Sequence, residues 1–270
     1  MRSERLYRTE AIVVRRRDQG EADRVLTLCT PLGKLAVIAK GVRKVRSRKA
    51  GHLELFAHTR LVIARSRSSW DVVSQAETVE PHAILRGDLI RGTYARYVAE
   101  LYDRFVAEGE GGEPLFDLLR RTLGYLCEAE PGRETALLVR AYEQRLLTLA
   151  GFRPEWGHCV GAQEGRTCER PLKAEGNEPL GLDAERGGVL CAGCYQAHRK
   201  QRGIVSLSPA ALRLLRACQR QSFARMRSYP AEPALLDEVE RAMRHYVTHH
   251  LERNVRSSAF LRRLKREDGT

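Results

Sequence analysis

The sequence contains no run of 18 apolar residues, and its first residues, Met-Arg-Ser-Glu-Arg, lack the apolar segment of a secretory signal. A membrane-spanning helix needs about 20 predominantly apolar residues. A signal peptide needs an apolar segment of roughly 7 to 15 residues. We therefore expect neither a membrane span nor a signal peptide, and we predict a cytoplasmic protein.

The short motifs of common catalytic sites are also missing. There is no Gly-x-x-x-x-Gly-Lys-Ser/Thr loop, no Gly-x-Gly-x-x-Gly, no Gly-x-Ser-x-Gly and no His-Glu-x-x-His. His245 and His249, four residues apart, would share a helix face, with His250 beside them. Because no acidic helper accompanies them, we interpret them as surface or interface residues. The carboxylates show no catalytic pairing, so the sequence predicts a binding protein and not an enzyme.

Carboxylates are absent between Asp23 and Glu54, and six cations fall within residues 40–49 of that gap. Such a run repels itself unless a polyanion neutralises it, and contacts of this kind supply most sequence-independent affinity for nucleic acid. The net charge of +13 is concentrated at the two ends, with +8 in residues 1–80 and +7 in residues 201–270. The run favours a nucleic-acid-binding surface, and a solvated, mobile loop is the alternative interpretation.

The first 80 residues predict a small barrel. Five short segments rich in Val, Ile and Leu are separated by turn or polar residues, a pattern typical of strands. Five strands fit a Greek-key barrel of the OB type, which binds oligonucleotides on one face and in its loops. The basic run falls between the third and fourth expected strands. The expected strands are residues 11–17, 24–30, 34–40, 53–64 and 70–76.

After Pro81 the apolar spacing becomes helical, and the whole is expected to be an α+β multidomain protein. Apolar residues repeated at helical spacing predict helices over residues 85–105, 115–126 and 133–150, and Gly151 is expected to end the last of these. Ser208-Pro209 is expected to open a helix over residues 210–221, and another follows over 233–254. We expect an OB domain at 1–80, a helical domain at 81–156 and 201–270, and a cysteine module at 157–200 that interrupts it.

The cysteine module predicts a structural zinc site. Cys191 and Cys194 have the two-residue spacing that lets two thiolates face one tetrahedral ion, and Cys159 with Cys168 would complete the set. Eight residues separate Cys159 from Cys168, so His158 and His198 remain alternative ligands, and four reduced thiols remain the alternative to a metal site. Seven cysteines in a cytosolic chain argue against disulfides. The other three, in expected strands or helices, are interpreted as small buried residues: Cys29, Cys127 and Cys218.

Several segments resemble the RecO family of bacterial recombination mediators. The N-terminal resemblance lies in Ile-Val-Val at 12–14, Gly-Glu-Ala-Asp-Arg at 20–24, Leu-Thr-Leu at 26–28, Gly33 and residues 39–48. Further on it lies in Leu-Ala-Gly-Phe-Arg-Pro at 149–154, residues 187–194 and residues 249–257. The resemblance covers nearly the whole chain. The long spacing between Cys159 and Cys168 departs from the family, whose zinc-bearing members usually begin this module with a two-residue spacing.

The resemblance implies a non-enzymatic, nucleoid-associated protein of DNA repair and recombination. Such proteins bind single- and double-stranded DNA, anneal complementary strands coated by single-strand-binding protein, and work with RecR to load RecA. Two other classes stay open. One is an RNA-binding or ribosome-associated barrel with a zinc module, and the other is a metal-dependent hydrolase of nucleic acid, which would need an open metal position and a base.

On this basis the cations of the barrel are expected to contact DNA phosphates: Arg15, Arg17, Lys34, Lys40, Arg43, Lys44, Arg46, Arg48 and Lys49. Trp70 could stack on a base, although a tryptophan in a strand more commonly belongs to the core. Four arginines edge the apolar faces of the C-terminal helices, where the acidic tail of single-strand-binding protein could bind. They are Arg213, Arg216, Arg220 and Arg225, and an ordinary solvated helix face is the alternative.

Overall fold

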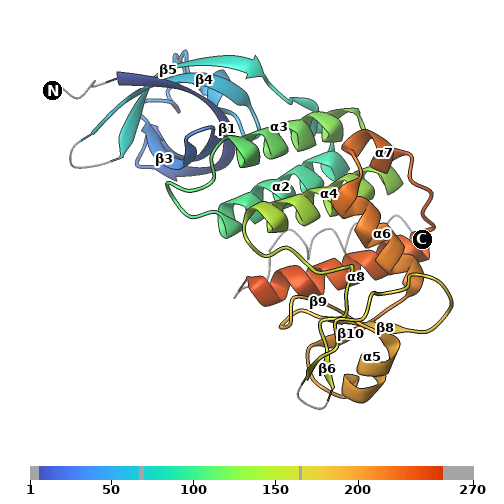
Figure 1. Ribbon diagram of the computed structural model, residues 1–270. Coiled ribbons are helices and arrows are strands. Elements are labelled where there is room, and N and C mark those ends of the chain that lie inside the picture. Colours follow the sequence, from blue (N-terminus) through green and yellow to red (C-terminus); the bar gives the residue numbers. More distant parts are fainter. Residues whose placement is uncertain (1–5, 67–69, 164–165, 252–270) are drawn as a thin grey trace. The chain divides into compact units, whose positions relative to one another are not determined.

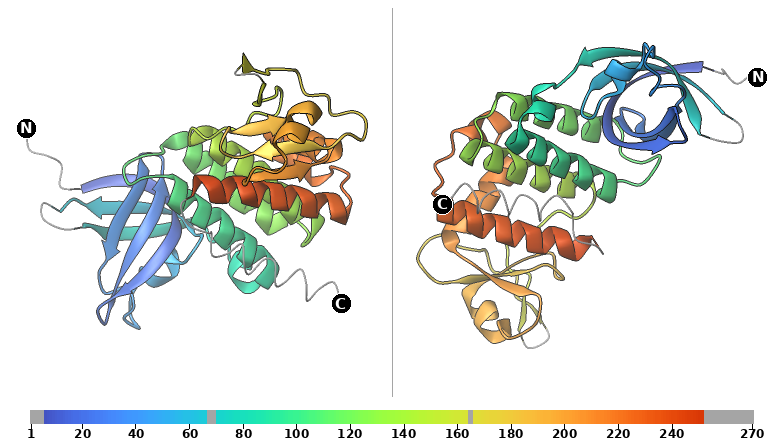
Figure 2. Two further views of the ribbon diagram at one scale, coloured as in Figure 1. Left: turned by 90° about the horizontal axis from the view of Figure 1, so that it is seen from below. Right: turned by 180° about the vertical axis from the view of Figure 1, so that it is seen from behind.

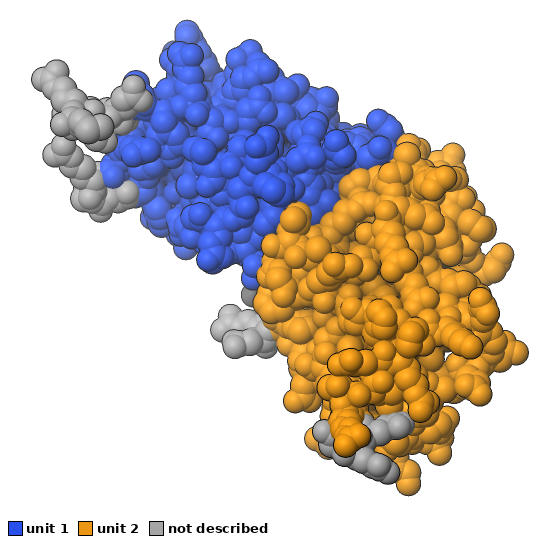
Figure 3. All heavy atoms as spheres, viewed as in Figure 1, with its two compact units in different colours: residues 1–128, 259–270 blue, residues 129–258 orange. Residues whose placement is uncertain are grey.

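The computed structural model describes residues 6–66, 70–163 and 166–251 (Figure 1). These residues divide into two compact units, the first ending at Glu128 and the second beginning at Ala129 (Figure 3). The first unit holds the barrel and its following helices, and the second holds further helices and two small sheets. In the part of the chain that is described, no helix combines the length and apolar character needed to cross a membrane.

The first unit begins with a five-stranded barrel of the OB type, which confirms the predicted fold class. The circular strand order is β1-β2-β3-β5-β4. β1 is long enough to pair antiparallel with β4 through its first half and with β2 through its second. A short parallel pairing between β3 and β5 completes the barrel. The strands are β1 Leu6–Gln19, β2 Asp23–Thr30, β3 Gly33–Ala39, β4 His58–Ala64 and β5 Asp71–Glu80.

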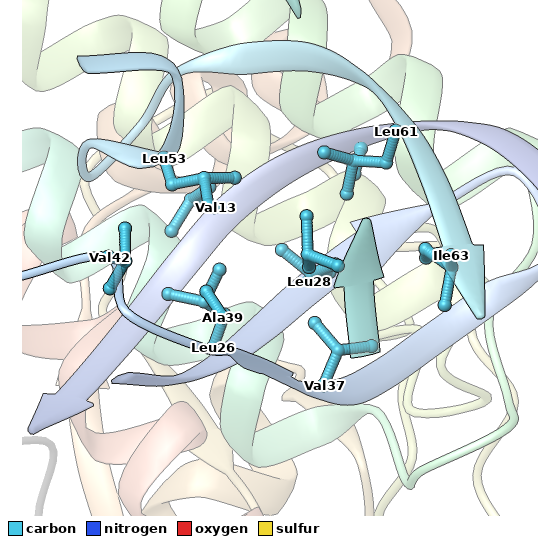
Figure 4. Close-up of a cluster of buried hydrophobic side chains, with 11 residues drawn as sticks. Val13, Leu26, Leu28, Val37, Ala39, Val42, Leu53, Leu61 and Ile63 are labelled. Carbon is cyan, nitrogen blue, oxygen red and sulfur yellow. The ribbon is translucent and has the colours of Figure 1, made fainter. Parts of the chain in front are cut away.

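Alternate strand residues point into the barrel and form its core (Figure 4). Leu26 and Leu28 of β2 and Val37 of β3 are at most 1% exposed. Two further core residues, Val42 and Leu53, come from outside the strands. Val42 belongs to the basic run itself, so this run begins with a side chain anchored in the core.

The structure corrects the strand predicted over residues 53–64. Ala50–Leu53 is a short 3-10 helix, η1, and β4 starts only at His58. Between them Phe56 has a left-handed backbone with φ of 68°, and its amide donates to the carbonyl of Val13 at 2.8 Å. The apolar residues typical of a strand are here buried by a turn and a short helix. Periodicity does not separate these cases over so few residues.

Three helices follow the barrel in the first unit, and Pro81 does end the strand region. The stripe from Leu85 predicted one helix, but Asp88 interrupts it, because its carboxylate accepts the Arg91 amide at 2.8 Å and caps a new helix. Gly92 permits the two helices to approach, since an added Cβ would meet the Leu85 carbonyl oxygen at 2.4 Å. The helices are α1 Ile84–Gly87, α2 Leu89–Phe105 and α3 Glu113–Glu128.

The connection between α2 and α3 is tied to β3. The Lys34 amide donates to the Glu110 carbonyl and the Gly109 amide to the Lys34 carbonyl, both at 2.8 Å. Glycine is required at position 33, where φ is 118° and a Cβ would come within 2.8 Å of the Glu110 oxygen. These bonds join the barrel and the helices of the first unit.

In the second unit α4 packs against α6, α7 and α8 (Figure 2). Two predicted helix ends are confirmed. Gly151 follows α4 with a left-handed φ of 85°, and the Ser208 hydroxyl accepts the Ala211 amide at the start of α6. α8 was predicted to run to residue 254, and residues 252–254 lie outside the described part. The helices are α4 Arg133–Leu149, α6 Pro209–Arg220, α7 Phe223–Arg227 and α8 Pro233–His250.

Between α4 and α6 the chain loses helical periodicity, as predicted, and forms a small module. It contains a three-stranded sheet in the order β10-β8-β9, a two-stranded ribbon of β6 and β7, and one short helix. Gly187 makes the turn before β9 with φ of 74°. The elements are β6 Ala162–Gln163, β7 Arg166–Thr167, β8 Leu180–Asp183, β9 Gly188–Leu190, α5 Ala192–His198 and β10 Ile204–Leu207.

Candidate nucleic-acid interface and metal centre

The basic loop, residues 40–49, is a chain of turns with both ends anchored to the barrel. At its start the Gly41 amide donates to the Asp23 carboxylate at 2.7 Å, and the Arg43 amide donates to the Ala22 carbonyl at 2.9 Å. At its end the Lys49 ammonium donates to the Val73 carbonyl at 2.8 Å, and burial lowers the pKa of this group. The loop therefore has a defined conformation, which argues against the mobile-loop interpretation.

The cations of the basic loop differ in their surroundings. Arg43 is bound back to the barrel, with its guanidinium 3.3 Å from the Asp18 carboxylate and 3.1 Å from the Gly20 carbonyl. A hydrogen bond from Arg24, together with the charge of Arg43, lowers the pKa of Asp18. The remaining four cations are exposed: Lys40, Lys44, Arg46 and Arg48.

The three cations expected on the strands also differ in their surroundings. The Lys34 ammonium is held inside the first unit, 2.6 Å from the Asp103 carboxylate and 3.0 Å from the Val106 carbonyl, with its side chain 15% exposed. Arg15 is 63% exposed and lies 3.4 Å from the same aspartate. Arg17 lies over the ring of Trp70 at 6.0 Å from the ring centre. Because Trp70 is 39% exposed, its interpretation as a core residue is wrong.

In the second unit the four cysteines named from the sequence come together. The sulfurs of Cys159, Cys168, Cys191 and Cys194 all lie within 4.8 Å of one another, and those of Cys168 and Cys191 are 3.9 Å apart. Tetrahedral zinc at about 2.3 Å from each sulfur places two sulfurs about 3.8 Å apart. The donor set and its spacing fit such an ion, so the eight-residue gap between the first two cysteines is no obstacle.

The backbone around the cluster is shaped for sulfur ligands. The Cys191 and Gly161 amides donate to the Cys159 sulfur at 3.1 and 3.4 Å. A Cβ at Gly161 would come within 2.9 Å of the Cys194 sulfur, so only glycine fits there. This requirement had no signal in the sequence, because an isolated glycine in a loop-rich segment has many possible reasons.

The cysteine thiols of the cluster have different proton affinities. Burial raises the pKa of Cys159 and of Cys194, whereas the backbone amide of Arg170 lowers the pKa of Cys168. Neither alternative ligand joins the group found among the described residues. The His198 Nδ1 instead lies 2.8 Å from the Cys194 carbonyl.

The remaining cysteines are mostly buried, as interpreted from the sequence. Cys29 and Cys218 are fully buried, and burial raises the pKa of each thiol to about 12. Cys127 is only half-buried, with a pKa raised by burial to about 11. Their raised pKa values make them poor nucleophiles and poor ligands at neutral pH.

Two of the four arginines expected to meet a partner tail instead hold the module to α6. The Arg216 guanidinium donates to the Trp156 carbonyl at 2.6 and 2.9 Å and to the Leu172 carbonyl at 2.9 Å. Arg213 donates to the Ala174 carbonyl. Arg213 is nevertheless exposed, as are Arg220 and Arg225. No feature of the sequence distinguished these two pairs.

One family model matches the OB-type barrel, and a second matches the helices together with the four-cysteine module. Recombination protein O N terminal matches residues 1–82, and Recombination protein O C terminal matches residues 86–259. Both models describe recombination proteins, which is the class to which this fold and these sites belong. The chain is a member of the RecO family.

Curated relatives agree with this assignment over nearly the full chain. A DNA repair protein RecO from a Roseiflexus species is 40% identical over 258 residues, 96% of this chain and 86% of the relative. A DNA repair protein RecO from Desulforudis audaxviator is 37% identical, covering 96% of this chain and 97% of the relative. A third, from Pelotomaculum thermopropionicum, is 35% identical, covering 96% and 95%. The family therefore supports a role in recombinational DNA repair.

Proposed function

We propose that this protein binds single- and double-stranded DNA and anneals complementary strands during recombinational repair. The observation that carries the proposal is the anchored basic loop, which presents four exposed cations on an OB-type barrel. Membership in the RecO family supports the same role. The proposed phosphate contacts are Lys40, Lys44, Arg46 and Arg48 in the loop, with Arg15 and Arg17 on β1. Lys34, Arg43 and Lys49 are less suited, because each is engaged within the first unit.

Annealing on this surface would follow from charge neutralisation. Two DNA strands repel each other through their phosphates, and a strand held against cations presents less negative charge to its complement. A loop with anchored ends loses little conformational entropy when a strand binds, which favours affinity. No covalent bond is made or broken, so the proposed activity requires no catalytic group.

We further propose that the four cysteines hold one zinc ion with a structural role. Four thiolates fill a tetrahedral zinc site and leave no position for water or substrate, so the ion would stabilise the module. This closed arrangement gives no support to hydrolysis of nucleic acid.

The proposed protein partners, supported by the family resemblance, are RecR, RecA and the acidic tail of single-strand-binding protein. Arg220 on α6 and Arg225 on α7, both exposed, are proposed to meet that tail.

The function is tested by strand annealing without ATP, with and without single-strand-binding protein. A variant with Lys44, Arg46 and Arg48 changed to Ala should anneal more slowly and bind DNA more weakly. The slope of log affinity against log salt should flatten by about 2 to 3, since each lost phosphate contact contributes roughly 0.7 to 0.9. Unchanged affinity at roughly 100 mM salt would remove the loop from the interface. RNA of matching sequence serves as competitor, and preference for RNA would favour the RNA-binding alternative.

A further inference from the structure

The outer face of the barrel beside the basic loop is apolar. The strand register places four residues in one row across β1, β2, β3 and β5, because Arg17 pairs with Val25, Val25 with Ile38, and Ile38 with Val72. The neighbouring residues Leu26, Val37 and Val73 point into the core, so the row faces outward. We call Arg17, Val25, Ile38 and Val72 the outer row. Its three apolar members are partly exposed.

Trp70 lies beside the outer row. It lies two residues before Val72, and side chains two apart on an extended segment point to the same face. Its 39% exposure and its contact with Arg17, whose guanidinium lies 6.0 Å from the ring centre, agree with that direction. In the strand order β2 and β3 lie between β1, which carries Arg17, and β5, which begins directly after Trp70, so the contact links the two ends of the row.

The outer row also adjoins the anchors of the basic loop. Arg17 is followed by Asp18, which binds Arg43, and Val72 is followed by Val73, which accepts from Lys49. A DNA strand whose phosphates contact the basic loop would therefore have its bases within reach of the outer row. Arg15, 63% exposed and two residues before Arg17, adds a cation at the other side.

We propose that Trp70 and the outer row form a stacking face for the unpaired bases of a single strand. This inference rests on the proposed function, because the basic loop must first hold the backbone. Aromatic rings and arginine planes stack on any base, since every base has a π-face, while the bases of a duplex are already stacked and unavailable. The cations at both sides favour a nucleic-acid strand over an apolar protein partner. The face would thus give this surface its preference for unpaired strands.

The first experiment uses Trp70 as its own reporter. The chain has two tryptophans, and Trp156 is 2% exposed in the second unit. In a Trp156→Phe variant, an oligomer of about 15 thymidylates, near the upper end of the roughly 4 to 16 nucleotides that one OB fold covers, should quench the Trp70 fluorescence and shield it from acrylamide. Binding is followed in parallel through a labelled oligomer. Unchanged fluorescence at saturation would overturn the proposal.

The second experiment separates stacking from phosphate contact. Trp70→Ala should weaken binding of the thymidylate oligomer about tenfold, with an unchanged salt slope because no phosphate contact is lost. Trp70→Phe should retain most of the affinity. Binding of an abasic oligomer and of a duplex of equal length should be the same in Trp70→Ala and in the unaltered protein. Val79→Ala, on β5 itself and 38% exposed, is the matched control and should change nothing.

The outcomes distinguish this inference from the function on which it rests. If the unaltered protein binds no single strand, the proposed function fails. If it binds and Trp70→Ala binds as tightly, only the stacking face fails. An equal loss of affinity for abasic, duplex and thymidylate ligands would mean that Trp70 supports the fold instead, which also overturns the inference, and an unfolding curve of the variant would confirm that reading.

Discussion

At the scale of single residues, the environment of a charge decides its use. Lys34 and Lys40 lie at the two ends of the same short stretch of chain, and both are cations in a region without carboxylates. The Lys34 ammonium is surrounded by the Asp103 carboxylate and two main-chain carbonyls, whereas Lys40 is exposed. The first charge stabilises the unit, and only the second is available to a phosphate.

These two lysines form a matched pair for mutation. Lys34→Met should lower the free energy of unfolding by about 2 kcal/mol, because it removes the charged hydrogen bonds of the ammonium to the Asp103 carboxylate and to two main-chain carbonyls. Lys40→Met should leave stability unchanged and reduce the salt slope of DNA binding by about 0.7 to 0.9. Urea unfolding and DNA titrations at several salt concentrations measure both effects. The reverse pattern would contradict the assignment of the two lysines.

At the scale of elements, the arginines of α6 have two different roles, one in packing against the module and one on the exposed surface. Arg216 lies toward the module and donates to the carbonyls of Trp156, before Cys159, and Leu172, after Cys168, so it joins the helix to both sides of the segment that carries the first two cysteines. Arg220, one turn further along, is exposed. The helical repeat of 3.6 residues fixes which residues share a face of α6. Whether a residue on that face is packed or exposed depends on what lies against the helix at that position.

A second pair of substitutions separates these purposes. Arg216→Met should lower the free energy of unfolding of the second unit by about 2 kcal/mol, since it leaves two carbonyls without their donor. Arg220→Met should preserve stability and weaken binding of the C-terminal peptide of single-strand-binding protein to the full chain. Calorimetry and fluorescence anisotropy of the labelled peptide provide the two readouts. Equal peptide binding by Arg220→Met and the unaltered protein would remove Arg220 from the proposed contact.

At the scale of the whole molecule, the barrel and the four-cysteine cluster belong to different compact units. The core of the barrel is formed by its own strands, the basic loop and η1. The cysteine cluster draws its ligands from the module of the second unit alone. Loss of a structural ion is therefore expected to act on one unit while sparing the other.

Zinc removal tests this separation. Purified protein should contain about one equivalent of zinc, and chelation should lower the unfolding temperature of the second unit while leaving oligonucleotide binding by the barrel intact. Acid should act in the same direction: burial raises the pKa of the Cys159 and Cys194 thiols, so protons compete with the metal increasingly as pH falls. Cys159→Ser should lose the ion, and Cys127→Ser, outside the cluster, should keep it. Less than about half an equivalent in the unaltered protein would refute the site.

Local pattern in the sequence determined the kind of elements and their order. Spacing of apolar residues and turn residues indicated the five strands, the caps at Gly151 and Ser208, and the cysteine module, because these signals act over a few neighbouring residues. The prediction of a strand from Leu53 was wrong because these signals are local: a short helix and a turn bury the same apolar side chains that a strand would bury. Family resemblance was carried by the order of these parts.

Tertiary structure alone decided which side chains face solvent and which distant residues meet. It brought Cys159 and Cys168 to Cys191 and Cys194 despite their long spacing, committed Lys34 and Arg216 to internal carbonyls, and exposed Trp70 beside Arg17. The sequence gives the type of each residue and therefore the interactions that its side chain is able to make. Which of these interactions it makes depends on neighbours distant in the chain, and only the packed fold specifies them.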